Sequence, residues 1–203
     1  GLEATKERLR QLVEIGALLA QKYDVVVTNP PYMGSSGMGE KLAEYVKANF
    51  PNGKNDLFAC FIEKSLEMLA HNGLAGLMTS YTWMYLTAYS MLREVLIDNY
   101  SLYSLIQPEY HAFFQEAFVP ICTFIMRNSE FNFSGKYIRL EDFTGADQQN
   151  LRALEAINNN DCGYLYTIRQ KEFKKIPNCP IAYWLNTKTI GLFESQKMLS
   201  KYA

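Results

Sequence analysis

Apolar residues follow two different spacings along the chain, and each spacing predicts a different kind of element. Residues 2–22 place leucine, isoleucine and valine at helical spacing among charged side chains, which predicts an amphipathic helix. The same pattern predicts helices over residues 40–50, 57–70, 83–99 and 189–199, with a polar helix-forming stretch over 145–160. Short apolar or β-branched runs predict strands over residues 25–28, 74–80, 102–106, 119–126 and 136–140. These elements indicate an α/β fold.

The first predicted strand, residues 25–28, is short and ends abruptly. Its β-branched residues are apolar on both sides, which favours a parallel sheet covered on both faces. Pro30 and Pro31 cannot continue the strand, because proline lacks an N–H group and fixes φ. Pro30 also keeps Asn29 out of the helical region. Asn29 and Tyr32 are therefore predicted in a rigid loop at the carboxyl end of a strand, where open α/β sheets bind ligands.

The residues of this loop suit a planar exocyclic amine as substrate. Such an amine is a poor nucleophile, because its lone pair is delocalised into the ring. The Asn29 side-chain oxygen and the Pro30 carbonyl can accept both amine hydrogens, which favours the tetrahedral, nucleophilic form of the nitrogen. The Tyr32 ring offers a face on which a base can stack. This chemistry requires neither a side-chain nucleophile nor a metal ion, and we predict no metal site.

The segment Asn29-Pro30-Pro31-Tyr32, following an apolar strand, resembles the catalytic motif of DNA amino-methyltransferases that use S-adenosylmethionine. NPPY in particular is similar to the motif of N6-adenine enzymes. The resemblance covers residues 20–128 and, more loosely, the tail as far as Trp184. The alternative interpretation is a proline-rich turn, but a chance NPPY in a chain of this length is on the order of one in a thousand.

The resemblance extends to Asp56-Leu57-Phe58, which matches a D-L-[FY] triplet that lines the cofactor and target pockets of the family. It implies that Asn29, Asp56 and Phe58 bind the cofactor. Asp56 is equally well explained as the N-cap of the helix predicted over residues 57–70.

The family also has an aromatic residue that packs on the flipped adenine, in the loop before a later strand. Phe114 precedes the strand predicted over residues 119–126 by the same offset, and Phe118 is the second choice. The resemblance therefore implies that Tyr32, Phe114 and Phe118 bind the target adenine. The alternative for both phenylalanines is an ordinary place in the core.

Residues 1–22 contain no Gly-rich cofactor loop and no acidic residue of the kind that the family places upstream for the ribose. The glycines of residues 33–40 follow the catalytic strand and lack a GK[ST] ending, so they predict a loop near the substrate. We therefore expect a partial Rossmann-like methyltransferase sheet with flanking helices, lacking the N-terminal cofactor-loop half. Residues 1–145 are the expected C-terminal half of the catalytic domain, and residues 146–203 the linker and start of a target-recognition region.

The tail contains two features that bear on nucleic acid. Residues 164–175 interleave basic and aromatic side chains, which is compatible with nucleic-acid contact or with a solvated strand and turn. Ile176-Pro177 and Pro180–Trp184 resemble a segment of the large single-chain methyltransferases of BREX-type phage-defence systems, in which it leads to target recognition.

Composition restricts the classes of protein to which the chain can belong. The formal net charge is -1, so we expect either a local basic patch or a main DNA-binding surface outside this chain. Four cysteines without CxxC pairing and two histidines argue against a zinc site and a disulfide framework. Reduced cysteines indicate a cytoplasmic protein. We find no signal peptide and no apolar run long enough to span a bilayer.

The expected function is methyl transfer from S-adenosylmethionine to N6 of an adenine flipped out of double-stranded DNA, in restriction-modification or phage defence. The expected partners are the missing N-terminal half, a downstream recognition domain and other defence-system subunits, and the isolated chain is expected to bind the cofactor weakly. Three alternatives stay open. The first is methylation of RNA bases or protein glutamine amides, and the second is a non-catalytic module that binds nucleic acid or a partner. The third is a methyltransferase fused to a nuclease, although no PD…ExK-like cluster is visible.

Overall fold

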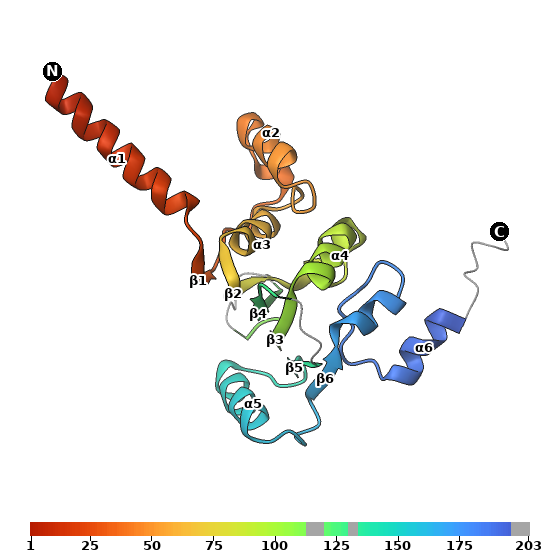
Figure 1. The fold of residues 1–203 in the computed structure, drawn as a ribbon. Helices are drawn as coiled ribbons and strands as arrows, with labels where there is room; N and C mark the ends of the chain where they lie inside the picture. Colours follow the sequence, from red (N-terminus) through yellow and green to blue (C-terminus); the bar gives the residue numbers. More distant parts are fainter. Residues whose placement is uncertain (113–119, 130–133, 196–203) are drawn as a thin grey trace.

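The computed structural model describes residues 1–112, 120–129 and 134–195, and a six-stranded mixed sheet lies at the centre of these residues (Figure 1). The strands are β1 (Tyr23–Thr28), β2 (Leu69–Ser80), β3 (Ser101–Pro108), β4 (Ile121–Arg127), β5 (Ser134–Leu140) and β6 (Leu165–Arg169). The helices are α1 (Leu2–Ala20), α2 (Glu40–Asn49), α3 (Leu57–Glu67), α4 (Ser90–Asn99), α5 (Ala146–Asn158) and α6 (Thr187–Ser195). The expected α/β fold class is confirmed.

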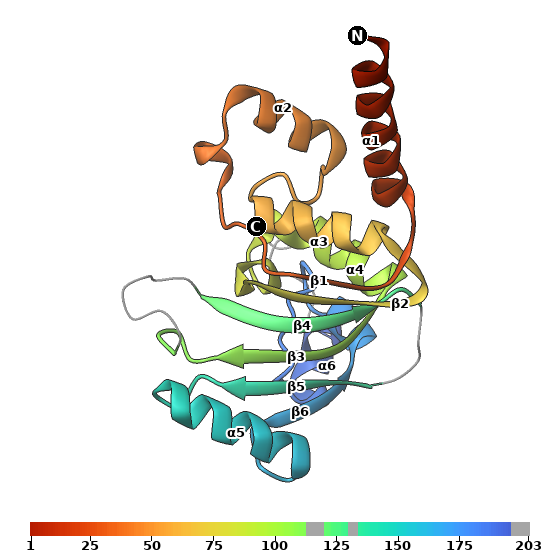
Figure 2. The same ribbon diagram turned by 90° about the vertical axis from the view of Figure 1, so that its left-hand side faces the viewer.

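The strands lie in the order β1-β2-β4-β3-β5-β6 (Figure 2). β1 is parallel to β2 and β3 is parallel to β5, whereas β4 runs antiparallel to both β2 and β3. β1, β2, β3 and β5 therefore all end at one edge of the sheet, at Thr28, Ser80, Pro108 and Leu140, and we call it the carboxyl edge. β6 pairs antiparallel with β5 and extends the same sheet.

The two faces of the sheet differ in how far they are covered. Helices α3 and α4 pack on one face, where Leu77 and Phe124 belong to the main apolar core. On the opposite face, β-sheet register aligns Val27, Gly76, Ile125 and Ser104 in one row. Val27 is 78% exposed, and within the described residues α5 covers this face only near β5. The expected parallel pairing is therefore found between β1 and β2 within a mixed sheet, but the expectation that both faces are covered is wrong for the described residues.

The helix expected over residues 83–99 is broken, and its cause is a buried arginine. Two 3-10 turns, Tyr81–Met84 and Thr87–Tyr89, precede α4. The Arg93 side chain is fully buried, and its guanidinium donates to the carbonyls of Trp83 at 2.7 Å and Leu86 at 2.8 Å. The Trp83 carbonyl thus turns toward Arg93 rather than toward an amide of a continuing helix, whereas the Leu86 carbonyl also accepts from the Tyr89 N–H at 3.0 Å in the second 3-10 turn.

The helix expected over residues 57–70 also ends early. α3 stops at Glu67 because Leu69 already pairs with Tyr23 in the parallel β1–β2 ladder. Asn72 adopts φ +66 within β2, where the register of the ladder shifts. Long-range strand pairing thus overrides the helical pattern of the local sequence.

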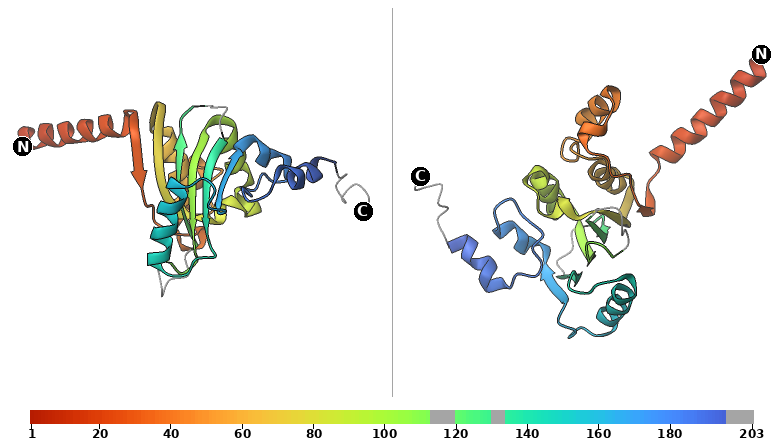
Figure 3. Two further views of the ribbon diagram at one scale, coloured as in Figure 1. Left: turned by 90° about the horizontal axis from the view of Figure 1, so that it is seen from below. Right: turned by 180° about the vertical axis from the view of Figure 1, so that it is seen from behind.

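The two ends of the described chain relate differently to the sheet. α1 projects away from the body and has no buried residue, and α6 lies at the opposite side of the molecule (Figure 3). Ile181 and Tyr183 of the tail belong to the main core. Among the described helices, none combines the length and apolar character needed to cross a membrane.

Candidate active site

Strand β1 delivers Asn29, Pro30, Pro31 and Tyr32 to the carboxyl edge. The β1–β2 pairing ends at Thr28 opposite Leu77, so the motif begins at the first residue beyond the ladder. Asn29 is exposed and Pro30 is buried. Within the described residues, no hydrogen bond reaches the Pro30 carbonyl oxygen. The structure thus places the two acceptors that the sequence predicts at the end of a strand.

Tyr32 connects the motif to the neighbouring strand. Its hydroxyl lies 3.1 Å from Asn29 Oδ1 and 3.2 Å from the Met78 carbonyl oxygen, and either atom can accept its proton. Burial, followed by the nearby Cys122, raises the pKa of the Tyr32 phenol above its ordinary value, so the group is neutral at physiological pH. Tyr32 is therefore a neutral hydrogen-bond donor that orients the Asn29 amide.

Phe58 supports the Tyr32 ring from the core side. The two ring centroids lie 6.3 Å apart in an edge-to-face arrangement, and the Phe58 ring lies 5.7 Å from Tyr89. Phe58 is only 2% exposed, so it offers little surface to a ligand here. The cofactor-binding role of Phe58 stays a prediction.

Asp56 joins the start of α3 to the chain segment that follows the motif. Its Oδ1 atom accepts from the backbone N–H of Phe58 at 3.2 Å, which makes it the N-cap of α3. The same oxygen accepts from the backbone N–H of Met33 at 3.0 Å. The N-cap interpretation is confirmed, and the cofactor-binding role of Asp56 stays a prediction.

Phe114 and Phe118 lie outside the described residues. The segment that contains them starts after Ala112 and ends before Pro120, and both flanks are at the carboxyl edge, because β3 ends at Pro108 and β4 begins at Ile121. The Tyr81 amide donates to the Pro120 carbonyl at 2.9 Å, next to the end of β2. The role of Phe114 and Phe118 in adenine binding stays a prediction.

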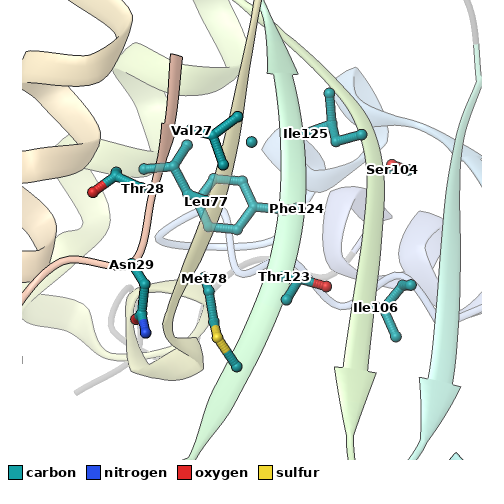
Figure 4. Close-up of a pocket in the computed structure, with 11 residues that line it drawn as sticks. Val27, Thr28, Asn29, Leu77, Met78, Ser104, Ile106, Thr123, Phe124 and Ile125 are labelled. Atoms are coloured by element: carbon teal, nitrogen blue, oxygen red, sulfur yellow. The ribbon is translucent and has the colours of Figure 1, made fainter. Parts of the chain in front are cut away.

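A hollow of about 510 Å³ lies on the uncovered face of the sheet and reaches Asn29 (Figure 4). Its walls come from four strands and include Val27, Met78, Ile106 and Thr123. The loop that follows the motif, with Gly34, Gly37 and Gly39, forms a short 3-10 turn rather than a phosphate cradle, and Met38 packs against Val46 and Cys60. The interpretation of residues 33–40 as a loop beside the site fits this arrangement.

Sequence reasoning missed a polar and aromatic cluster at the carboxyl edge. Gln107 is 1% exposed and accepts hydrogen bonds from Tyr85 at 3.0 Å and Tyr183 at 2.7 Å. Gln107 donates in turn to Glu141, which also pairs with Arg139. The only local signal for this cluster is a glutamine inside an apolar strand, because its partners lie far away in the sequence. Among the described residues, no cluster of His, Cys, Asp and Glu has the geometry for a metal ion.

Comparison with known proteins agrees with this geometry. Residues 3–114 match the model of the Eco57I restriction-modification methylase family. An adenine-specific methyltransferase, PglX of Lacticaseibacillus casei (strain Zhang), is 34% identical over 189 residues, which cover 92% of this chain and 16% of that protein. The adenine-specific methyltransferase BrxX of Escherichia coli O9:H4 (strain HS) is 36% identical over 179 residues, which cover 87% of this chain and 14% of that protein.

Solved structures show the same fold at lower sequence identity. The methyltransferase subunit of a type I restriction-modification system from Streptococcus thermophilus superposes with a TM-score of 0.58 at 14% identity, over 81% of this chain and 38% of that one. The matched part of this chain spans only 16% of PglX and 14% of BrxX, a small part of the length of these curated relatives. The family model covers more than half of the chain, and strand β1 and the motif Asn29–Tyr32 lie inside the match. The chain belongs to the Eco57I restriction-modification methylase family.

Proposed function

We propose that the polypeptide carrying this chain transfers a methyl group from S-adenosylmethionine to N6 of adenine in double-stranded DNA, in restriction-modification or phage defence. The observation that carries the proposal is the placement of Asn29, exposed and oriented by Tyr32, at the end of a strand beside the Pro30 carbonyl. The curated relatives named as adenine-specific methyltransferases support it.

The residues of the motif would act on the amine rather than on the ring. The Asn29 Oδ1 atom and the Pro30 carbonyl accept the two N6 hydrogens, so the nitrogen lone pair leaves conjugation and points away from both acceptors. The N6 lone pair would then bond to the methyl carbon as the bond from that carbon to sulfur breaks, and one N6 proton would pass to solvent water. Tyr32, backed by Phe58, supplies a stacking face for the flipped base. Positioning supplies most of the rate, because no residue of the chain forms a covalent intermediate.

S-adenosylmethionine would supply an electrophilic methyl group, whose bond to sulfur breaks with the electron pair left on sulfur. The described residues fit one wall of its site, since Asn29 faces open space at the carboxyl edge and borders the hollow on the uncovered face. Within the described residues β1 has only β2 as a strand neighbour, so the ribose contacts would come from other parts of the polypeptide.

The proposal includes an arrangement of the larger protein. Residues 1–145 would complete a catalytic domain with an upstream half, and residues 146–203 would lead to a DNA-recognition domain. β6 pairs with β5 in the same sheet as β1, and Tyr183 belongs to the main core, so the described part of the tail packs with the proposed catalytic domain. The four cysteines of the chain are free thiols, in keeping with a cytoplasmic enzyme. Its partners there would be DNA and other defence-system subunits.

The test is a methylation assay with the natural polypeptide that carries this sequence. Labelled S-adenosylmethionine is supplied with duplex DNA, with RNA and with glutamine-containing peptide in parallel, and the product base is identified. We expect N6-methyladenine in duplex DNA, and about a 10²–10³-fold loss of rate in Asn29→Ala, because a preorganised acceptor is removed. Asn49→Ala, an exposed asparagine of α2, is the matched control.

Two results would contradict the proposal. Label that enters RNA or glutamine but not DNA would favour the other planar amines. Undiminished DNA methylation in Asn29→Ala would place the reactive site elsewhere.

A further inference from the structure

We propose that Asp56 is a positioning residue for the motif Asn29–Tyr32, and that it acts through the backbone of Met33. This inference rests on the proposed function for its catalytic consequence. The structural part, a carboxylate that fixes the downstream end of the motif, stands on the contacts alone.

Met33 is the first residue after the motif, and both of its backbone polar groups are held by the start of α3. Its N–H donates to Asp56 Oδ1 at 3.0 Å, and its carbonyl accepts from the Leu57 N–H at 3.0 Å. The next residues continue this pairing, because the Ser35 N–H donates to the Asn55 carbonyl at 2.9 Å and Gly34 forms an antiparallel bridge with Asp56. The chain leaving the motif is thus paired with residues 55–57.

The motif itself has few other anchors. Pro30 and Pro31 have no N–H groups, so they contribute no backbone donor. The upstream end is fixed by the β1–β2 ladder as far as Thr28, and the Tyr32 hydroxyl reaches the Met78 carbonyl on β2. Met33 is the corresponding anchor on the downstream side. Without the Asp56 carboxylate, the Met33 N–H loses its acceptor and the downstream end keeps only the backbone pairing with residues 55–57, so we expect the motif to be held less tightly.

Asp56 accepts one hydrogen bond more than a helix N-cap requires. One carboxylate oxygen accepts from both Met33 and Phe58, so the cap of α3 and the anchor of the motif share an atom. A serine at this position can still cap the helix, but its oxygen lies one bond closer to the backbone, so we expect it to reach the Phe58 N–H and not the Met33 N–H. The site thus distinguishes a capping role from an anchoring role, and the two can be separated by substitution.

The first experiment measures amide hydrogen exchange at Met33 and Phe58 in this chain and in three variants. Asp56→Ser is expected to keep the Phe58 amide protected, while the Met33 amide exchanges about tenfold faster, because only the anchor opens. Asp56→Asn keeps an acceptor oxygen in place and is expected to protect both amides, and Asp56→Ala to expose both. Asp147→Ser, at an exposed position in the first turn of α5, is the matched control.

The second experiment measures kcat and the Kd for S-adenosylmethionine in the polypeptide that carries the chain. Asp56→Ser is expected to lower kcat by about 10²-fold with little change in Kd, because a small misplacement of the reacting groups slows the reaction strongly. Asp56→Asn is expected to restore most of the rate. A direct charge contact with the cofactor would instead raise Kd in both variants.

These outcomes separate the anchor from the proposed function. Absence of methyl transfer by the wild-type polypeptide contradicts the proposed function, and the exchange at Met33 still decides the anchor. Unchanged Met33 exchange in Asp56→Ser, or a kcat for that variant equal to wild type, overturns the positioning role. A rise in the cofactor Kd with unchanged kcat overturns it in favour of cofactor binding.

Discussion

Two short proline-containing segments of the chain differ in how far their side chains are buried. The motif Asn29–Tyr32 leaves a strand and keeps its asparagine exposed at the carboxyl edge. The tail segment from Ile176 to Tyr183 also contains two prolines and a tyrosine, yet Tyr183 is 1% exposed within the main core. Prolines and aromatics alone therefore do not say whether a segment is a reactive loop or part of the core.

The difference lies in what holds each segment. The motif is stiffened by its own prolines and held by contacts at its two ends, so the Asn29 side chain stays exposed. The tail takes an unfavourable backbone, with φ +65 at Asn178 and φ +51 at Cys179, and a buried guanidinium holds the carbonyls of both residues. A substitution in the tail should therefore cost stability, and one in the motif should cost activity.

The largest effect on stability is expected for Arg93→Met. Arg93 is 0% exposed and holds four carbonyl groups, two of them in the tail. Burial lowers its pKa, as expected for a cation away from water. We expect the free energy of unfolding to fall by about 3–5 kcal/mol, because a buried charged network is broken. Chemical denaturation measures this, with the exposed Arg10→Met as control, and a change equal to the control would mean that the tail does not depend on Arg93.

A smaller effect is expected for Tyr183→Phe. The Tyr183 hydroxyl donates to buried Gln107 at 2.7 Å, while the ring stacks on Tyr137 with centroids 5.1 Å apart. Phenylalanine keeps the stacking and removes the hydrogen bond, so we expect a loss of about 1 kcal/mol. Thermal unfolding beside the exposed Tyr45→Phe tests this. Equal melting temperatures for the two variants would show that the Gln107 contact contributes nothing.

Tyr32→Phe tests a residue of the motif that, unlike Asn29, is partly buried against the core. The Tyr32 hydroxyl is half-buried and contacts both Asn29 and Met78. We expect a loss of about 0.5–1 kcal/mol in the free energy of unfolding, because one partly solvated hydrogen bond is removed. A loss as large as that of Arg93→Met would place Tyr32 among the core residues and remove the contrast between the segments.

The smallest effect on stability is expected for Asn29→Ala. The side chain is exposed and lies beyond the last paired residue of β1, so we expect the free energy of unfolding to change by less than about 0.5 kcal/mol. The same variant should lose most of its methyl-transfer rate. Denaturation curves measure the free energy of unfolding, and the methylation assay measures the rate on the same preparation. Strong destabilisation would mean that the motif serves the fold rather than the reaction.

Much of the candidate site follows from neighbouring residues. The β-branched run of residues 25–28 and the prolines after it predicted a strand and its end, and Asp56 was identified as a cap before α3. Other features depend on distant partners. The helical pattern over residues 83–99 did not reveal that Arg93 would bind carbonyls up to 86 residues away and break the helix.

The amino-acid sequence by itself determined where strand β1 ends, which residues follow it and which hydrogen bonds they can accept, because backbone stereochemistry and side-chain type act over a few residues. Only the tertiary structure decided that Phe58 backs Tyr32, that Asp56 anchors Met33 across 23 residues, and that one face of the sheet near β1 is uncovered in the described chain. Such contacts are set by how the strands pair and the helices pack, and local pattern does not contain that information.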